Sequence, residues 1–362
     1  MKRNALLKKY GCVALAMILL ILCASCTGSA PASSSQAASS APASATEKAS
    51  SEDKVGAEFI LKAGHTVAAD HPYQRGLEYL DQLLNERTDG KVRLEIYPSA
   101  QLGGERELFE GAQMGTVDLA LGATAPLANF DKSFLVFDLP YLFDSREHAY
   151  RCLDGEFGNS KFEILKNSGM IGLAYWEAGF FPIATSKKTM NTPEDASGLN
   201  IRVMENELFM AWITAMGSNP VPMAFSEVFT AVQNGTVDGA SVSIASIFTS
   251  KLYTVAPYLD RLDAIYSPLP LVVSKVTWDK LPAEFQDILR EAAIEARDYE
   301  REYITNAEKE YIEQMQSEGT TVRDYTPAER KVWEDAVKPK IWGDYVGGKV
   351  LESDIAAIEA MK

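Results

Sequence analysis

The chain contains the same helix-to-strand connection twice. Residues 107–121 read ELFEGAQMGTVDLAL and residues 227–241 read EVFTAVQNGTVDGAS, so Gly-Thr-Val-Asp and several preceding residues recur at identical offsets. In each copy a helical pattern ends at a glycine, Gly115 or Gly235, which tolerates the left-handed conformation that closes a helix. A strand pattern follows. Two equivalent units predict two lobes of related build, and the alternative is a chance recurrence of a short helix-strand pattern.

Apolar strand-like runs alternate with amphipathic helical runs along the rest of the chain. Strands are expected within residues 57–66, 91–98, 117–123, 199–205, 236–242 and 266–274, with a helix at 73–87. This alternation predicts an α/β fold whose largely parallel sheets are covered on both faces. In such sheets ligands bind beyond the carboxyl ends of the strands, so the loops near Ala123 and Val242 are expected to line a cleft between the lobes.

A helical spacing of apolar residues continues from Pro282 to about Gly319. At 1.5 Å per residue such a helix is about 50 Å long, which exceeds the width of one lobe. It is therefore expected to pack against both lobes. A coiled-coil partner helix is the alternative, but alanine and tyrosine along the seam suit it less well than leucine would.

The N-terminal residues have the parts of an export signal and are set aside from the fold. Residues 1–25 begin with basic side chains and continue with an apolar run, Gly11 to Ala24, that is too short for a membrane span of roughly 20 residues. The small Ser25 before Cys26 resembles a lipobox, in which Cys26 is lipidated and anchors the chain outside the cytoplasm. A plain cleaved signal is the alternative, because Cys23 stands where leucine is usual. Residues 26–55, rich in serine and alanine, read as a flexible tether.

The net charge limits which partners the chain can bind, and its cysteine content limits which disulfides it can form. Removing residues 1–25 takes away four of the 35 basic residues and none of the 50 acidic ones, which leaves a net charge of −19. Nucleic acid is excluded as a partner by this balance, and any membrane association must come from the lipid anchor. Only Cys152 remains in the folded part, where we expect a buried apolar side chain and no intramolecular disulfide.

Several long stretches in the same order carry a family resemblance. They are YPSAQLGGERELFEGAQMGTVDLALG (97–122), TAPLANF (124–130), FDLPYLF (137–143), GLNIRVMEN (198–206), NPVPMAFSEVFTAVQNGTVDG (219–239) and SKLYTVAPYL (250–259). Over nearly all of residues 59–361 the chain resembles the substrate-binding proteins of tripartite ATP-independent periplasmic (TRAP) transporters. The resemblance implies a two-lobed periplasmic-binding-protein-like (type II) fold with hinge strands and a long helix spanning both lobes.

The resemblance also implies a domain plan and a function. The first lobe is expected to comprise residues 56–178 plus about 268–307, and the second about 179–267 plus 308–362. The implied function is that of an extracytoplasmic receptor, not an enzyme, which captures a small organic acid between the lobes without a cofactor. Its expected partners are the small and large membrane subunits of the transporter, and the receptor itself is expected to be a monomer.

Arg202 is the central candidate residue. It stands between Ile201 and Val203 on an expected strand, and a charged group on a covered strand needs a partner. In proteins similar to this one the equivalent arginine grips the ligand carboxylate with both arms of its guanidinium, for which a planar fork suits better than lysine. An internal salt bridge or a solvated strand end is the alternative.

Other site candidates have structural alternatives of similar weight. Phe225 matches a family pocket position; a hydrophobic staple is the other interpretation, although its partner would be Thr230, a poor match. Glu205 and Asn206 follow the strand of Arg202 and either contact the ligand or favour the helix start electrostatically. The first strand is followed by His65, His71 and Tyr73, where related proteins approach the ligand. No metal site is expected, because these histidines have no carboxylate pattern beside them.

Departures from the family pattern indicate the ligand. Phe181 stands where many relatives carry a second arginine, and Ala123, Ala240, Ser241 and Val242 replace polar residues of other relatives. We therefore expect a monocarboxylate with an apolar or aromatic body beside Phe181, Phe225 and Trp176. The full set of expected ligand-binding residues is Arg202, Phe225, Phe181, Trp176, Ala123, Thr124, Glu205, Asn206, Ser241, Val242, His65, His71 and Tyr73.

Two rival functions remain open at this point. An extracellular enzyme is disfavoured, because the chain has no G-x-S-x-G, H-E-x-x-H or phosphate-loop motif and offers no nucleophile-base pair among its three histidines. A receptor for an ATP-driven importer or a sensor kinase would share the two-lobed cleft. Neighbouring genes for a small and a large membrane protein would favour a TRAP system.

Overall fold

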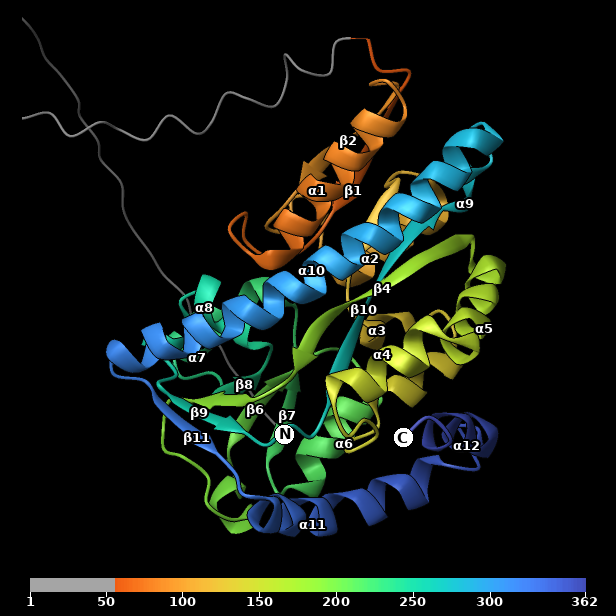
Figure 1. Ribbon diagram of the computed structural model, residues 1–362. Helices are drawn as coiled ribbons and strands as arrows, with labels where there is room; N and C mark the ends of the chain where they lie inside the picture. Colours follow the sequence, from red (N-terminus) through yellow and green to blue (C-terminus); the bar gives the residue numbers. More distant parts are fainter. Residues whose placement is uncertain (1–55) are drawn as a thin grey trace, which may run out of the picture. The chain divides into compact units, whose positions relative to one another are not determined.

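The structure is a computed structural model, and it describes residues 56–362. The expected signal, tether and lipidated Cys26 lie outside the described residues. Two separate sheets organise the described part (Figure 1). We call the residues around the five-stranded sheet the first lobe and those around the six-stranded sheet the second lobe. The two-lobed α/β fold expected from the sequence is confirmed.

The first sheet has the order β2-β1-β3-β10-β4. Its strands are β1 (Phe59–Gly64), β2 (Val92–Tyr97), β3 (Leu119–Leu121), β4 (Met170–Phe180) and β10 (Tyr266–Ser274). Its helices are α1 (Pro72–Arg87), α2 (Glu105–Met114), α3 (Thr124–Leu127), α4 (Arg146–Asp154), α5 (Glu156–Leu165) and α9 (Lys275–Trp278), with 3₁₀ turns η1 (Lys132–Asp138) and η2 (Lys166–Ser168).

The second sheet has the order β11-β9-β5-β8-β6-β7. Its strands are β5 (Ile183–Thr185), β6 (Asn200–Val203), β7 (Asn219–Pro222), β8 (Gly239–Ser241), β9 (Tyr258–Arg261) and β11 (Thr321–Asp324). Its helices are α6 (Glu207–Ala215), α7 (Val228–Gln233), α8 (Ile244–Thr249) and α11 (Pro327–Tyr345), with 3₁₀ turns η3 (Pro193–Ala196), η4 (Phe225–Glu227) and η5 (Leu252–Thr254).

The sheets are largely parallel, as expected, but each contains one strand that runs against all the others. Strand β10 runs antiparallel to both β3 and β4, and β5 runs antiparallel to both β8 and β9. The reason is topological: the chain leaves the first sheet along β4 to reach β5, and it returns along β9 to reach β10. A strand that returns from the other lobe enters its sheet in the opposite direction.

The repeated connection has the same backbone geometry in both lobes. Gly115 has φ 78° and Gly235 has φ 71°, so both adopt the left-handed conformation expected from the sequence. The next two N–H groups donate to one carbonyl in each copy, that of Gly111 after α2 and that of Ala231 after α7. The helix end is therefore closed in the same way twice.

The aspartate of the repeat explains why the sequence recurs. Asp118 donates its N–H to the Lys62 carbonyl oxygen at 3.0 Å, and its carboxylate accepts the Lys62 N–H at 2.8 Å. Asp238 makes the same pair with Asn200, at 2.7 and 2.9 Å. Each aspartate thus binds the chain just before its own strand, β3 or β8, to the parallel neighbour, β1 or β6, and helps to set the register of that pair.

The long helix expected from the sequence is confirmed as α10 (Ala283–Ser317), 35 residues long. It packs on α1 and β4 of the first lobe and on α8 and β11 of the second (Figure 1). Ala292, Ala293 and Ala296 are fully buried, so small side chains let the helix approach its neighbours closely. Cys152 is also fully buried and free, as expected.

The C-terminal part differs from the expected domain plan. The last helix, α12 (Glu352–Glu359), packs on α5 of the first lobe, although residues 308–362 were assigned to the second. The His148 ring is 3.0 Å from the Ile358 carbonyl oxygen, and the Lys161 ammonium is 2.6 Å from the Asp354 carboxylate. Buried partners on α4 and α5 thus draw the end of the chain back to the first lobe.

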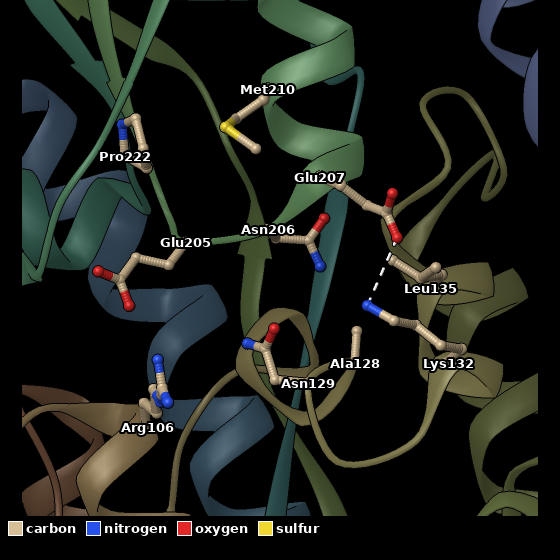
Figure 2. Close-up of a pocket in the computed structure, with 10 residues that line it drawn as sticks. All are labelled: Arg106, Ala128, Asn129, Lys132, Leu135, Glu205, Asn206, Glu207, Met210 and Pro222. Carbon is tan, nitrogen blue, oxygen red and sulfur yellow. Dashed lines mark ion pairs between the residues drawn. The ribbon is translucent and has the colours of Figure 1, made fainter.

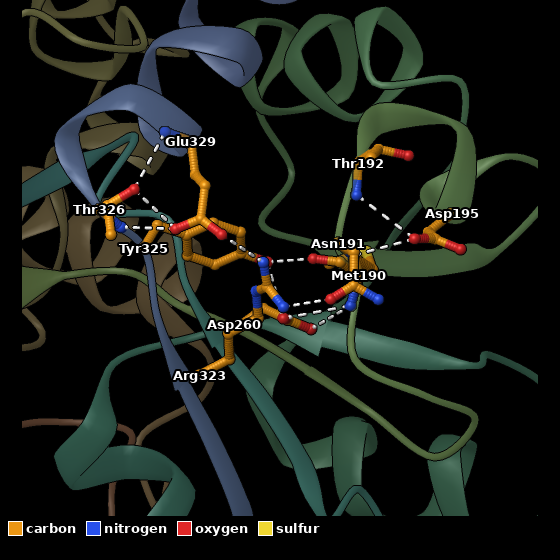
Figure 3. A network of polar contacts seen from close by, with 9 residues as sticks. All are labelled: Met190, Asn191, Thr192, Asp195, Asp260, Arg323, Tyr325, Thr326 and Glu329. Carbon is orange, nitrogen blue, oxygen red and sulfur yellow. Dashed lines mark hydrogen bonds and ion pairs between the residues drawn. The ribbon is translucent and has the colours of Figure 1, made fainter.

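A polar network fastens β11 to the second lobe (Figure 3). The buried carboxylate of Asp260 on β9 accepts the Met190 N–H at 3.1 Å and the Tyr325 hydroxyl at 2.8 Å. Burial raises the pKa of Asp260 to about 6. Next to it, Arg323 pairs with Glu329 at 3.0 Å at the start of α11. The long helix is therefore followed by a strand that is firmly held in the second sheet.

Candidate functional site

The loops after the two repeated strands line one cavity, as the sequence predicts. Ala123 follows β3 in the first lobe and Val242 follows β8 in the second. The cavity has a volume of about 40 Å³, far below the roughly 300 to 1,000 Å³ of pockets for drug-sized molecules. Its lining consists of Thr66, Val67, Tyr73, Glu105, Ala123, Ala178, Phe181, Arg202, Met204, Phe225, Val242, Ser243 and Ser246.

Arg202 on β6 brings a buried cation to this cavity, with 3% of the residue exposed. Its Nε and Nη2 atoms donate to the Met223 carbonyl oxygen at 3.0 and 2.8 Å, and Nη1 lies 3.5 Å from the Ser241 carbonyl oxygen. Within residues 56–362 no carboxylate lies within 4.0 Å of it. Because a guanidinium has five N–H donors, these contacts leave two of them for a further acceptor.

The charge of Arg202 is maintained despite its burial. Burial lowers the pKa of Arg202 to about 10, and the more distant carboxylates of Glu105, Glu205 and Glu227 oppose this effect. The group stays cationic at neutral pH. A buried cation held by carbonyl oxygens alone is costly, and a carboxylate arriving with two oxygens would satisfy both its charge and its remaining donors.

Glu105 is a second ionisable group of the cavity, and the sequence interpretation missed it. It begins α2, and its Oε1 accepts the Ala123 N–H at 3.2 Å. Burial raises the pKa of Glu105. The sequence signal was ambiguous, because an acidic residue in the first turn of a helix is ordinarily explained by the helix dipole. Six other lining residues were also absent from the expected set: Thr66, Val67, Ala178, Met204, Ser243 and Ser246.

Three aromatic side chains that were expected at the site do line the cavity. Phe181 follows β4, Phe225 begins η4, and Tyr73 lies in the first turn of α1. Phe181 packs against Phe209 with the ring planes tilted by 52° and the centroids 6.1 Å apart, while Phe225 is only partly buried. The apolar wall is therefore contributed by both lobes and by the connection between them.

Trp176 is not brought to the cavity, which corrects its expected role. It is fully buried on β4, and its Nε1 donates to the Ala293 carbonyl oxygen of α10 at 3.4 Å. A Cβ atom on Gly76 of α1 would lie 2.4 Å from its ring. The indole thus fills the space beneath α1 and α10, where its size is needed for packing.

The two histidines lie behind the cavity wall. The His65 Nε2 atom is 2.8 Å from Gln74 Oε1, and burial lowers the pKa of His65. His71 caps α1: its Nδ1 accepts the Tyr73 N–H at 3.2 Å, so the ring proton sits on Nε2 and is donated to Ser246 Oγ at 3.3 Å. His71 therefore connects the first lobe to α8 of the second.

Thr124 and Ser241 also lie behind the cavity lining. Both residues are fully buried. The Thr124 hydroxyl is 3.4 Å from the Asp138 carboxylate, and the Ser241 hydroxyl has no hydrogen-bond partner among the described residues. Ser241 reaches the site through its carbonyl oxygen, which faces Arg202.

Glu205 and Asn206 line a different groove between the lobes (Figure 2). This groove has a volume of about 350 Å³, and Lys132 crosses it to within 3.5 Å of the Glu207 carboxylate. It is larger than the cavity beside Arg202 but more open, and its charged groups already face each other. The expected direct contacts of Glu205 and Asn206 with the ligand are therefore not supported by their positions.

Residues 56–362 lack two further features. No helix in this range is long and apolar enough to cross a membrane. No group of three or more histidine, cysteine, aspartate or glutamate side chains in the same range is arranged to hold a metal ion.

Comparison with known proteins agrees with this geometry. The family model described as "Bacterial extracellular solute-binding protein, family 7" matches residues 63–345. The chain is 32% identical over 305 residues to the C4-dicarboxylate-binding periplasmic protein DctP of Rhodobacter capsulatus, covering 83% of this chain and 90% of that protein.

Two solved structures are similar throughout the folded part. The sugar acid binding protein DctPAm of Advenella mimigardefordensis, in complex with galactonate, has a TM-score of 0.80 at 29% identity and covers 84% of this chain and 98% of its own. A TRAP periplasmic solute-binding protein of Polaromonas sp. JS666, bound to D-erythronate, has a TM-score of 0.79 at 34% identity with the same coverage. This chain therefore belongs to bacterial extracellular solute-binding protein family 7.

Proposed function

We propose that the chain is the extracytoplasmic receptor of a TRAP transporter and that it captures a small monocarboxylate beside Arg202. The observation that carries this proposal is the buried guanidinium without a carboxylate partner among the described residues. A cation in such a position is stabilised by an anion that enters the cavity. The relatives bound to galactonate and D-erythronate support an organic acid as that anion.

Glu105 favours a monocarboxylate over a dicarboxylate. Arg202 is the one basic residue of the cavity lining, and Glu105 is its one acidic residue. A second carboxylate on the ligand would meet Glu105, and two like charges in a buried site repel each other by several kcal/mol. The Glu105 carboxylate can instead accept a hydrogen bond from a ligand hydroxyl. Because one relative is a C4-dicarboxylate-binding protein, the preference for a monocarboxylate over a dicarboxylate needs a direct test.

The rest of the lining supports a ligand with an apolar side. Phe181 and Phe225 face the cavity together with Ala178, Met204 and Val242. Burial of apolar surface contributes about 25 cal/mol per Å² to affinity before the entropic costs of binding. The ligand we propose is therefore a compact monocarboxylate with an apolar face and one donor group directed to Glu105.

Delivery to the membrane follows from the same proposal. The receptor would present the acid to the small and large membrane subunits of the transporter as a monomer. Lipidation of Cys26 would hold it at the outer face of the cell membrane, on the tether of residues 26–55. Mass spectrometry of the intact mature chain tests this anchor, since an N-terminus without added lipid mass would contradict it.

The decisive experiment is calorimetry of the purified chain with D-erythronate, galactonate and succinate. We expect at least one of the two monocarboxylates to bind about tenfold or more tightly than succinate, and Glu105→Gln to reduce this preference about tenfold. Glu110→Gln, on the same helix and paired with Arg106 at 2.9 Å, is the matched control. Tight binding of succinate alone would contradict the monocarboxylate proposal.

The same samples distinguish the rival functions. Recovery of the unchanged acid after prolonged incubation would argue against an enzyme, and conversion of the acid would favour one. Genes for a small and a large membrane protein beside this one would support a TRAP system, whereas an ATPase or kinase gene there would support an ATP-driven importer or a sensor.

A further inference from the structure

The side-chain amide of Asn206 has no hydrogen-bonding capacity left for a ligand. Its Oδ1 caps α6 by accepting the N–H groups of Leu208 and Phe209 at 2.8 and 3.3 Å. Its Nδ2 donates to the Ala125 carbonyl oxygen at 3.0 Å and to the Asp138 carboxyl at 2.9 Å. An amide offers two donors and one oxygen with two lone pairs, and all of them are in use.

These contacts connect the two lobes. Asn206 precedes α6 in the second lobe, whereas Ala125 lies in α3 and Asp138 ends η1, both in the first. Asn206 is 4% exposed and Asp138 is 0% exposed. No cation lies within 4.0 Å of Asp138 among the described residues, so Asn206 supplies its closest polar contact across the interface.

We propose that Asn206 is a positioning residue that holds the two lobes together at the cavity, through Asp138 and Ala125, without touching the ligand. The proposal rests on the proposed receptor function for its biological meaning. Because the acceptors are buried when the lobes meet, loss of the amide leaves them unsatisfied in that state. When the lobes separate, water satisfies them instead.

Such a residue affects all ligands equally. It changes the equilibrium between joined and separated lobes. The apparent affinity of every ligand is proportional to the fraction of molecules in the joined state, so all affinities fall by the same factor. A residue that contacts the ligand would instead change the relative affinities of different acids. This difference separates a positioning role from a specificity role.

Three variants make the test specific. Asn206→Ser keeps a side-chain oxygen that caps α6 but removes the donor across the interface. Asp138→Asn keeps an acceptor for Asn206 and serves as the conservative control, since burial raises the pKa of Asp138 well above its usual value and favours a neutral side chain. Asp138→Leu removes the acceptor from the other side, and so provides a second route should Asn206→Ser fail to fold.

The readout is the distance between the lobes in the absence of ligand. Gln113 and Gln233 are exposed and occupy equivalent positions of the repeat, one in each lobe. A ketone-bearing amino acid at both positions accepts spin labels without involving the four cysteines of the chain. Pulsed electron paramagnetic resonance then gives the populations of short and long distances.

We expect both the wild-type and the Asp138→Asn chains to show a short-distance population. The ratio of the short-distance to the long-distance population should be the same in the two chains. In Asn206→Ser and Asp138→Leu this ratio should fall about 5- to 30-fold, as expected for buried acceptors left without a donor. A wild-type chain without a short-distance population, or a wild-type ratio in both variants, would overturn the proposal.

Calorimetry with D-erythronate and galactonate adds a second measurement. The dissociation constants of the acids that bind should rise by one common factor in Asn206→Ser, and unequal factors would assign Asn206 to ligand contact instead. If neither acid nor any other carboxylate binds the wild-type chain, the proposed function is wrong. The distances between the spin labels without ligand would still test the role of Asn206.

Discussion

At the scale of single residues, the proposed function depends on a side chain whose burial is unfavourable until a ligand arrives. The Arg202 guanidinium is buried, its hydrogen-bond partners among residues 56–362 are carbonyl oxygens alone, and burial lowers its pKa to about 10. Burial without a counter-ion costs free energy in the empty protein. Binding of a carboxylate recovers that cost, so affinity should depend on this residue far more than stability does.

We expect Arg202→Ala to weaken binding of the tightest monocarboxylate about 30-fold to several thousand-fold, equivalent to about 2 to 5 kcal/mol. Arg202→Lys keeps the charge but not the fork, so its loss should be intermediate. Calorimetry measures the affinity, and urea unfolding of the ligand-free chains should show a change below about 1 kcal/mol. Wild-type affinity in Arg202→Ala would remove this residue from the mechanism.

At the scale of elements, the repeated connection places equivalent loops on the two sides of the cavity. Its two glycines have the same backbone conformation but different surroundings. A Cβ atom on Gly115 would lie 2.9 Å from the Cβ of Val276, whereas one on Gly235 would meet nothing within 4 Å. Alanine substitutions at these two glycines can therefore distinguish the cost of backbone strain from the cost of a steric clash.

We predict that Gly235→Ala lowers the free energy of unfolding by about 1 to 2 kcal/mol, the cost of a Cβ in the left-handed region. Gly115→Ala should lose clearly more, because the added methyl group also strikes Val276. Urea unfolding measures both. Val276 is 42% exposed, and Val276→Ala should restore Gly115→Ala to the level of Gly235→Ala. Equal losses in the two single variants would show that the contact with Val276 relaxes freely.

At the scale of the whole molecule, the lobes are connected by α10, by the strands β4 and β10, and by polar contacts across their interface. His71 is one of these contacts, since it caps α1 and donates to Ser246 of α8. Burial, and secondarily the neighbouring His65, lower the pKa of His71 well below its usual value. The folded protein therefore requires the neutral imidazole.

This requirement gives a pH dependence of stability. In the unfolded chain His71 binds a proton below about pH 6.5, while in the folded chain it does not, so the free energy of unfolding should fall as pH decreases from 6.5 toward 5. The slope is at most about 1.4 kcal/mol per pH unit for one histidine. We expect the difference between wild type and His71→Gln to carry this slope in urea unfolding, since other groups titrate equally in both chains. A pH-independent difference would contradict it.

Much of the architecture could be predicted because it depends on residues that are close together in the sequence. The glycine and aspartate of each repeat act on their own helix end and the adjacent strand, so Gly115, Gly235 and the loops they precede were found from spacing alone. The long helix followed from apolar periodicity. Arg202 was singled out by the family resemblance, because its place between apolar neighbours on a strand left an internal salt bridge or a solvated strand end open.

Other features required the tertiary structure, because they depend on residues distant in sequence. Glu105 reads as an ordinary helix start until α2 is packed beside Ala123. From the sequence, Trp176 was expected to line the pocket, but in the structure α1 and α10 cover it. Asn206 was expected to contact the ligand, but its amide donates to Asp138. The sequence by itself thus determined the two lobes, their shared edge and the cation of the site. Only packing decided which other side chains face the cavity, because the direction of a side chain depends on what fills the space around it.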